Sequence, residues 1–293
     1  MNAEWKVTPE EIAGIFQEIR RMRPLIHMVP NAVSASLCAD GLSALGARPL
    51  MAVAACEMVE ITQQADASVI NLGQPDMEKL RAAELVIKEA AGSAKPLLLD
   101  PVGCGASRFR LESVQKLLNM PWQGIVKGNR SELYSIQQNC LTKEGVDAIA
   151  DWELSGQIPP GRVYLATGRE DLVLWEGECV KILHRKGHCP EKMSRYNIVG
   201  SGCLTGAVAG ACYGAVLGMR SEQQEKPDGR LYVRKAVTAT LAASFGMAFG
   251  MERAGMASGY GMAKAALLDG LYMLAGQEFE DWLRQKMQID CGG

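Results

Sequence analysis

The sequence predicts an α/β fold in which helices cover both faces of a largely parallel sheet. Short, continuous apolar runs recur along the first half of the chain, and longer stretches with helical spacing of their apolar positions lie between them. Strands buried on both faces read as continuous apolar runs, and consecutive parallel strands need a helix-length connection. These two observations together favour a parallel sheet between two helical layers.

The first predicted helix runs from about residue 8 to 22. Thr8-Pro9-Glu10-Glu11 has the capping-box pattern with proline at the first helical position. Apolar residues follow at helical spacing, namely Ile12, Ile15, Phe16 and Ile19. The runs predicted as the next strands are PLIHMV, PLMAV, SVINLG, PLLLD and GIVKG. The stretches predicted as helices between them are 31–45, 56–65, 76–91 and 107–119.

The rest of the chain is predicted to add strands and then to become helical. RVYLAT and LVLWEGECVKI have strand composition and are separated by a turn at 168–171. Every segment after Gly202 is predicted to be helical. The hydrophilic segments around 185–197 and 220–230 are too short for interdomain linkers, so we expect surface loops there. Because there is no internal repeat, we expect one domain over residues 1–293.

Composition excludes several classes of partner. The chain has 293 residues, of which 48% are hydrophobic, and its net charge of −2 gives no basic excess for a nucleic-acid backbone. Two uncharged stretches, Tyr196 to Met219 and 236–251, are rich in small residues. The helical part of the first, Cys203 to Gly218, has about 16 residues, fewer than the roughly 20 that span a bilayer. We therefore expect buried core helices, with neither nucleic acid nor membrane as a partner.

The amino terminus and the cysteines favour a cytoplasmic protein. The first residues carry charge where a signal peptide needs a continuous apolar run. The nine cysteines are scattered and never have CxxC spacing, which is typical of reduced thiols.

Four motifs follow predicted strands at the places where ligands bind in such folds. They are Asp100-Pro101-Val102-Gly103, Gly128-Asn129-Arg130-Ser131-Glu132, Thr167-Gly168 and Gly200-Ser201-Gly202-Cys203. The carboxyl ends of parallel strands meet in one crevice, into which helix amino termini point free N–H groups. Each motif alone also has an ordinary explanation as a turn or a helix cap. Their joint occurrence in this order favours a functional site.

The motifs together resemble the hydroxyethylthiazole kinase family of the ribokinase-like superfamily of small-molecule kinases. The resemblance covers nearly the whole chain: HMVPN at 27–31, ALGARPLMA at 44–52, INLG at 70–73, DPVGCGASRFR at 100–110, VKGNRSEL at 126–133, LATG at 165–168 and GSGC at 200–203. Other superfamily members have aspartate after the glycine turn, and Cys203 there is similar to this family. The resemblance implies a ribokinase-like fold and ATP-dependent phosphorylation of the primary hydroxyl of 4-methyl-5-(2-hydroxyethyl)thiazole in thiamin salvage.

The GSGC motif predicts a catalytic role on physical grounds. Gly200, Ser201 and Gly202 carry little side chain, so backbone N–H groups at the helix start approach a transferred phosphoryl group and stabilise its charge. Cys203 is then expected beside the substrate hydroxyl, where the helix amino terminus favours a thiolate that accepts the proton. Phosphoryl transfer depends chiefly on positioning and charge, so a modest base suffices. The alternative is a small buried thiol that packs the helix start.

The resemblance assigns the nucleotide and metal residues. Asn129 and Glu132 match an NxxE-type motif that organises Mg²⁺, with Glu132 and Asp100 as the expected metal residues. One or two carboxylates are enough for Mg²⁺, which retains water. Lys127 and Thr167 match positions that contact ATP, as does Asn129. ATP and Mg²⁺ are the cofactors that follow.

The resemblance also assigns a substrate side. Met51 and Gly200 match positions that contact the thiazole alcohol, and Asn31 and His27 are expected to border the same place. Ordinary core roles are the alternatives for Met51 and His27. The family further implies a homotrimer with sites between subunits.

Departures from the family pattern fall near this substrate side. Ala32 replaces a larger residue, Val53 lies in a segment that often has polar residues, and Val199 removes a hydroxyl. Phosphorylation of another small heterocyclic alcohol therefore stays open. Two further alternatives are an ATP/ADP-dependent hydrated-nicotinamide-nucleotide dehydratase, whose members resemble GSGD, and a nucleotide-binding protein without activity.

Overall fold

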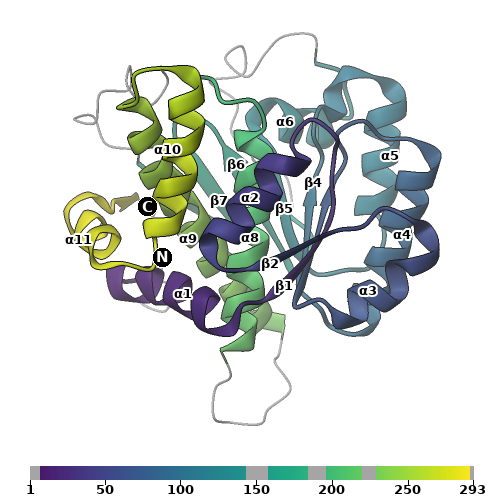
Figure 1. Ribbon diagram of the computed structural model, residues 1–293. Helices are drawn as coiled ribbons and strands as arrows, with labels where there is room; N and C mark the ends of the chain where they lie inside the picture. The colour runs from purple at the N-terminus through teal and green to yellow at the C-terminus, as the bar shows by residue number, and fades with distance from the viewer. Residues whose placement is uncertain (1–6, 143–157, 184–195, 220–228, 291–293) are drawn as a thin grey trace.

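A nine-stranded sheet forms the centre of the computed structural model (Figure 1). The structure describes residues 7–142, 158–183, 196–219 and 229–290. The strands are β1 (Leu25–Val29), β2 (Arg48–Met51), β3 (Ala67–Asn71), β4 (Leu97–Asp100), β5 (Gly124–Asn129), β6 (Arg162–Thr167), β7 (Asp171–Trp175), β8 (Glu178–Ile182) and β9 (Ile289–Asp290). The helices are α1 (Pro9–Met22), α2 (Ala35–Leu45), α3 (Met58–Gln64), α4 (Met77–Gly92), α5 (Arg108–Leu118), α6 (Arg130–Gln138), α8 (Ser201–Gly218), α9 (Gly229–Gly255), α10 (Tyr260–Met273) and α11 (Gln277–Lys286), with 3₁₀ turns η2 (Ala55–Glu57) and η3 (Cys104–Ala106).

The sheet is largely parallel, which confirms the predicted fold class. The strand order is β2-β1-β3-β4-β5-β6-β7-β8-β9. Pairing is parallel from β2 through β6, and β7, β8 and β9 are added antiparallel. The carboxyl ends of the parallel strands therefore meet at one edge.

Most predicted elements are confirmed, and their ends have local causes. α1 starts after Thr8, whose hydroxyl accepts the Glu11 N–H (3.2 Å) while the Glu11 carboxylate accepts the Thr8 N–H (2.8 Å). The helix predicted over 31–45 begins only at Ala35, because residues 31–34 form a turn. The stretch 56–65 is divided between η2 and α3.

Two predictions for the later part of the chain were wrong. LVLWEGECVKI is not continuous: Glu176 (φ 41°) and Gly177 (φ 85°) form a two-residue turn that joins β7 and β8 as a hairpin. The segment after Gly202 is not wholly helical, because β9 pairs with β8 and covers what would otherwise be an open sheet edge. The loops predicted at 185–197 and 220–230 lie mostly outside the described residues.

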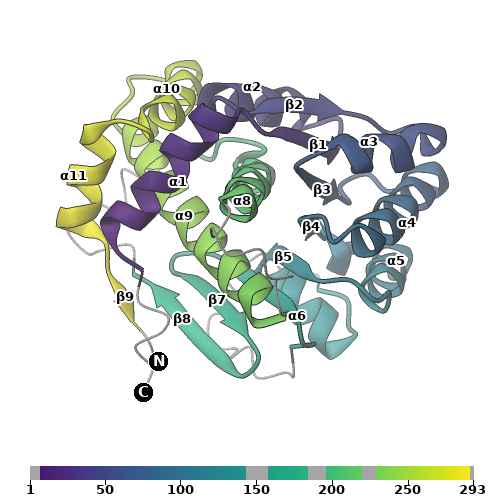
Figure 2. The ribbon, with the colours of Figure 1, turned by 90° about the horizontal axis from the view of Figure 1, so that it is seen from below.

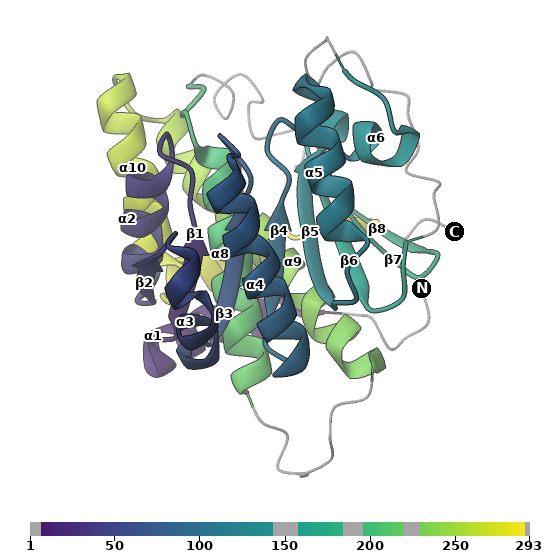
Figure 3. The ribbon, with the colours of Figure 1, turned by 90° about the vertical axis from the view of Figure 1, so that its right-hand side faces the viewer.

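Two helical layers enclose the sheet. α8 and α9 pack on one face together with α1, α2, α10 and α11, and α3, α4 and α5 cover the other (Figures 2 and 3). Alternate residues of each strand enter different cores: Val69, Leu98 and Ile125 belong to the core that contains α8, while their neighbours Ile70, Leu99 and Val126 belong to the core on the opposite face. This period of two decides which strand-end side chains face α8.

α8 is the central helix of the first core. Within the described residues it is the one helix that is long and apolar enough to cross a membrane by length and composition, but 78% of it is buried inside the fold. It starts at Ser201, two residues before the predicted start. Its packing between the sheet and α9 accounts for its apolar character and confirms the predicted core helix.

His27 lies in β1 and is fully buried. Its neighbours Ile26 and Met28 belong to the core of α8, so His27 points to the opposite face. There its Nδ1 lies 3.4 Å from the Ser68 hydroxyl, and its Nε2 has no hydrogen-bond partner. The residue is therefore a part of the sheet core.

The burial of His27 predicts an acid-dependent loss of stability. Burial lowers its pKa to about 4, against about 6.5 in an unfolded chain. Because the unfolded state binds the proton more tightly, this contribution is complete above pH ~6.5 and is lost as the pH falls toward ~4, by about 3 kcal/mol in all. We expect His27→Gln to have a flatter pH dependence in this window, measured as the urea-derived free energy of unfolding. Equal slopes for the two proteins would contradict this.

Candidate functional site

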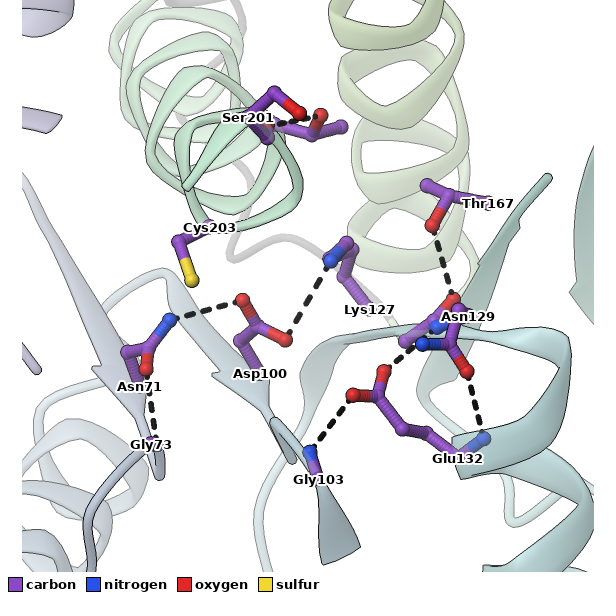
Figure 4. A network of polar contacts seen from close by, with 12 residues as sticks. Asn71, Gly73, Asp100, Gly103, Lys127, Asn129, Glu132, Thr167, Ser201 and Cys203 are labelled. Atoms are coloured by element: carbon purple, nitrogen blue, oxygen red, sulfur yellow. Dashed lines mark hydrogen bonds and ion pairs between the residues drawn. The ribbon is translucent and has the colours of Figure 1, made fainter. Parts of the chain in front are cut away.

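Side chains from four neighbouring strands meet at the carboxyl edge of the sheet, on the face of α8 (Figure 4). Asn71 ends β3 and is in register with Asp100, which ends β4. Lys127 lies near the end of β5, and Thr167 ends β6. Since Val69, Leu98, Ile125 and Leu165 point to α8, these polar residues two positions later do so as well.

Asp100 and Lys127 form a buried ion pair at the centre of the site. Lys127 Nζ lies 3.5 Å from Asp100 Oδ1, and their side chains are 5% and 0% exposed. Burial raises the pKa of Asp100 above its ordinary value, although the Lys127 charge opposes this. Burial would lower the pKa of Lys127, but the carboxylates of Asp100 and Glu132 outweigh it and raise it. The positive charge of Lys127 therefore lies beside a buried carboxylate, and a further cation would stabilise the charged form of that carboxylate.

Glu132 is held by backbone donors from two loops. One carboxylate oxygen accepts the Gly103 N–H and the other accepts the Asn129 N–H, both at 2.8 Å. The Asn129 side chain accepts the Glu132 N–H in return, at 2.8 Å, so the pair is a capping box for α6. Gly103 is in the left-handed region (φ 65°), which lets its N–H reach Glu132. Thr167 lies in register with Asn129, and its hydroxyl donates to the Gly128 carbonyl at 3.4 Å.

The amino terminus of α8 lies over the ion pair. Gly200 precedes the helix with φ 89°, a conformation that favours glycine, and a Cβ there would lie 3.0 Å from the Ser34 Cβ. A Cβ at Gly202 would lie 3.5 Å from Lys127 Nζ, and one at Gly206 would lie 3.4 Å from Asp100 Oδ2. Gly200, the N-cap residue, has no side chain to cap α8, and the Ser201 N–H donates to the Ile198 carbonyl at 3.1 Å. The first turn of α8 thus lies close to Lys127 at Gly202, and the next turn lies close to Asp100 at Gly206.

Cys203 belongs to the same network through two asparagines. Asn31 Nδ2 lies 3.4 Å from Cys203 Sγ and 2.7 Å from Asn71 Oδ1. Asn71 Nδ2 in turn donates to Asp100 Oδ2 at 3.0 Å. The role of Asn71 was missed in the sequence, where its one signal was a polar residue at the end of a buried apolar run.

The donor set fits a magnesium ion. Asp100 Oδ1 is buried without a hydrogen-bond partner, and Glu132 lies near enough for its charge to act on Asp100. Among the described residues no group of three or more His, Cys, Asp or Glu side chains is placed to enclose a metal. Mg²⁺ usually binds through one or two carboxylates together with water and substrate phosphates. The carboxylates of Asp100 and Glu132 are therefore sufficient in number.

Two of the predicted substrate residues lie apart from this network. His27 is buried on the other face of the sheet, as described above. Met51 ends β2, in register with Met28, and is half-buried against the α8 core. The structure thus brings together the predicted nucleotide, metal and catalytic residues with Asn31, while Met51 lies toward the β2 side of the same edge.

Comparisons with known proteins show which family this chain is similar to. The model of the hydroxyethylthiazole kinase family matches residues 16–275. Hydroxyethylthiazole kinase of Desulfovibrio desulfuricans is 31% identical over 279 residues, which cover 90% of this chain and 94% of that protein. The one of Methanocella arvoryzae is 31% identical over 273 residues, with 91% and 94% covered.

A solved structure gives the same result for the fold. The hydroxyethylthiazole kinase protein of Pyrococcus horikoshii OT3 superposes with a TM-score of 0.74 at 25% identity, over 96% of this chain and 99% of that chain. The expected ribokinase-like α/β fold is thereby confirmed. With most of its length matched by the family model and by relatives above 30% identity, the chain belongs to the hydroxyethylthiazole kinase family.

Proposed function

We propose that the protein catalyses ATP-dependent phosphorylation of the primary hydroxyl of 4-methyl-5-(2-hydroxyethyl)thiazole, a step of thiamin salvage. Family membership supports this reaction. The observation that carries it is the placement of the α8 amino terminus and Cys203 over the buried pair of Lys127 and Asp100. Neither alternative reaction gains support from the comparisons, and no observation favours the binding protein without activity. In this proposal residues 1–293 form one kinase domain.

The nucleotide side of the site supplies charge. Lys127 neutralises phosphate oxygens as a buried point charge, and the N–H groups of Gly202 and Cys203 add donors to the transferred phosphoryl group. Thr167 and Asn129, at the ends of β6 and β5, border the nucleotide. Asp100 and Glu132 would hold Mg²⁺, which supplies further neutralisation of phosphate charge when bound.

The substrate side supplies a proton acceptor and apolar contact. Cys203 Sγ receives the proton of the attacking hydroxyl, and Gly200 leaves room for the alcohol beside the first turn of α8. Met51 offers a polarizable side chain to the sulfur heterocycle. Val53 and Val199 depart from the family pattern, and their apolar side chains are 51% and 60% exposed. Apolar side chains at these positions suit contact with such a ring.

Substitution of Cys203 tests the proton acceptor. We expect Cys203→Ala to lower kcat roughly tenfold to a hundredfold while the KM for ATP stays the same, because a general base contributes a limited factor to this chemistry. Cys203→Asp should stay active. The measurement is ADP release with Mg²⁺, ATP and hydroxyethylthiazole, beside a reaction without alcohol.

Cys179→Ala serves as the matched control, since Cys179 is exposed on β8. Turnover of Cys203→Ala equal to that of the unchanged protein would refute the role of the thiol. Turnover with a different heterocyclic alcohol, and none with the thiazole, would move the proposal to that substrate.

Replacement of Asp100 tests the metal residues. Asp100→Asn keeps the side-chain shape but removes the charge beside Lys127, so we expect the Mg²⁺ concentration for half-maximal turnover to rise about tenfold or more. Calorimetric titration should show a matching loss of Mg²⁺-dependent ATP binding. Asp40→Asn, an exposed change on α2, is the control. An unaltered Mg²⁺ dependence of Asp100→Asn would remove Asp100 from the metal site.

We further propose a cytoplasmic homotrimer with sites between subunits. Exposed apolar side chains support a protein partner at this edge: Val33 and Val53, in the loops after β1 and β2, and Met77, the first residue of α4 after β3, are 62%, 51% and 72% exposed. Burial of such residues is a common basis of subunit contact. Light scattering of the purified protein should give three times the mass of one chain, and Val33→Asp should lower that mass. The mass of a single chain would exclude shared sites.

A further inference from the structure

Two buried asparagine side chains lie between Cys203 and Asp100. Asn31 follows β1 and is 4% exposed, and Asn71 ends β3 and is fully buried. A buried amide costs free energy unless its donors and acceptors are paired. The partners of these two amides therefore decide how each one is oriented.

The orientation of Asn31 is set by the start of α2. Its Oδ1 accepts the N–H of Val33 at 3.0 Å and that of Ser34 at 3.1 Å. Backbone N–H groups need an oxygen as acceptor, so the NH₂ side of Asn31 must face the site. Its two hydrogens serve Asn71 Oδ1 at 2.7 Å and Cys203 Sγ at 3.4 Å.

The hydrogen-bonding capacity of Asn31 is then complete. A side-chain amide has two acceptor positions and two donors, and all four are used by the protein itself. Asn31 therefore has no donor or acceptor left for an alcohol substrate, in contrast to the substrate contact expected from the sequence.

The orientation of Asn71 follows from that of Asn31. Its Oδ1 accepts Asn31 Nδ2 and the Gly73 N–H, the latter at 3.0 Å. Its Nδ2 consequently points to Asp100 and donates to Oδ2 at 3.0 Å. Gly73 is needed at this place, because a Cβ there would lie 2.8 Å from Asn31 Nδ2. Lys79 braces the same loop by donating to the Gly73 carbonyl at 2.6 Å.

The direction of these bonds carries the inference. Donors run from the α2 backbone through Asn31 and Asn71 toward two ends, the Cys203 sulfur and the Asp100 carboxylate, and both ends are left as acceptors. We propose that Asn31 and Asn71 are positioning residues, which hold the sulfur as a hydrogen-bond acceptor for the alcohol proton and keep it beside Asp100. This inference rests on the proposed kinase function.

The consequence for the sulfur is chemical. The hydrogen bond that Asn31 donates to Sγ fixes the position of the sulfur and leaves its remaining lone pairs to receive a proton. The thiolate is the form that alkylating reagents attack. Alkylation of Cys203 therefore reports on the amides without the need for ATP, Mg²⁺ or alcohol.

Asn31→Asp is the sharpest variant. One carboxylate oxygen still accepts the Val33 and Ser34 N–H groups, so the start of α2 is kept, while the other oxygen replaces both donors toward Asn71 and Cys203. We expect iodoacetamide to alkylate Cys203 about tenfold more slowly at neutral pH, because the sulfur loses the donor that holds it in place for attack. Peptide mass analysis separates Cys203 from the exposed Cys56 and Cys179. Asn119→Asp, an exposed change at the end of α5, should leave the rate unchanged.

A second variant keeps the test valid if the first does not fold. Asn31→Ser retains a hydroxyl that can accept a backbone N–H of the turn before α2 but is too short to reach the sulfur, and it should slow alkylation in the same way. An unchanged rate of Cys203 alkylation in a folded Asn31 variant would overturn the inference. Altered alkylation in a protein without thiazole-dependent ADP release would instead reject the proposed function and keep the arrangement of the amides.

Discussion

The burial of Lys127 against Asp100 is the constraint on which the site depends. Removing two charges from water costs several kcal/mol per ion before their attraction is counted, so the pair persists only where other groups stabilise it. Asn71 donates to the carboxylate, and Asp100 and Glu132 stabilise the ammonium. The amino terminus of α8 adds its N–H groups nearby. A site of this kind is prepared for the charge of a polyphosphate before any ligand arrives.

The strand order of the sheet fixes the order in which the polar side chains lie along the site. One face of β3, β4, β5 and β6 presents Asn71, Asp100, Lys127 and Thr167 in adjacent positions. The residues proposed for the nucleotide therefore lie on the β5–β6 side, and those proposed for the alcohol follow β1 and β2. Cys203 comes from a distant part of the chain, and α8 places it between these two groups, where the proposed reaction brings the hydroxyl and the phosphoryl group together.

The sequence was sufficient for the parts of the molecule that depend on local patterns. Apolar runs predicted β1 to β6, and the Thr8 capping box predicted α1. The strand-end motifs singled out Asp100, Glu132 and Cys203, and the resemblance to the family added Lys127. Contacts between distant parts of the chain could not be predicted from local patterns. The hydrogen bond between Asn31 and Cys203 joins residues 172 positions apart, and predicting it requires knowing how β1, β3 and α8 pack together. The two-residue strand β9 carries too short a pattern to be recognised. For His27 the sequence left a substrate role and a core role open, because a run of apolar residues does not show which face of a buried strand a side chain takes.

The saturation of the polar network limits how the alcohol is recognised. The donors and acceptors of Asn31 are all used by Val33, Ser34, Asn71 and Cys203. The other side chains proposed for the ring, Met51, Val53 and Val199, are apolar. Apolar contact distinguishes ligands by only about 1–3 kcal/mol for each methylene, whereas unpaired buried polar groups reject a ligand far more strongly. Selection of the substrate by this protein therefore rests on the position of its hydroxyl relative to Cys203 and on the shape of the ring, and close heterocyclic analogues with the same hydroxyethyl arm are the competitors that it excludes least.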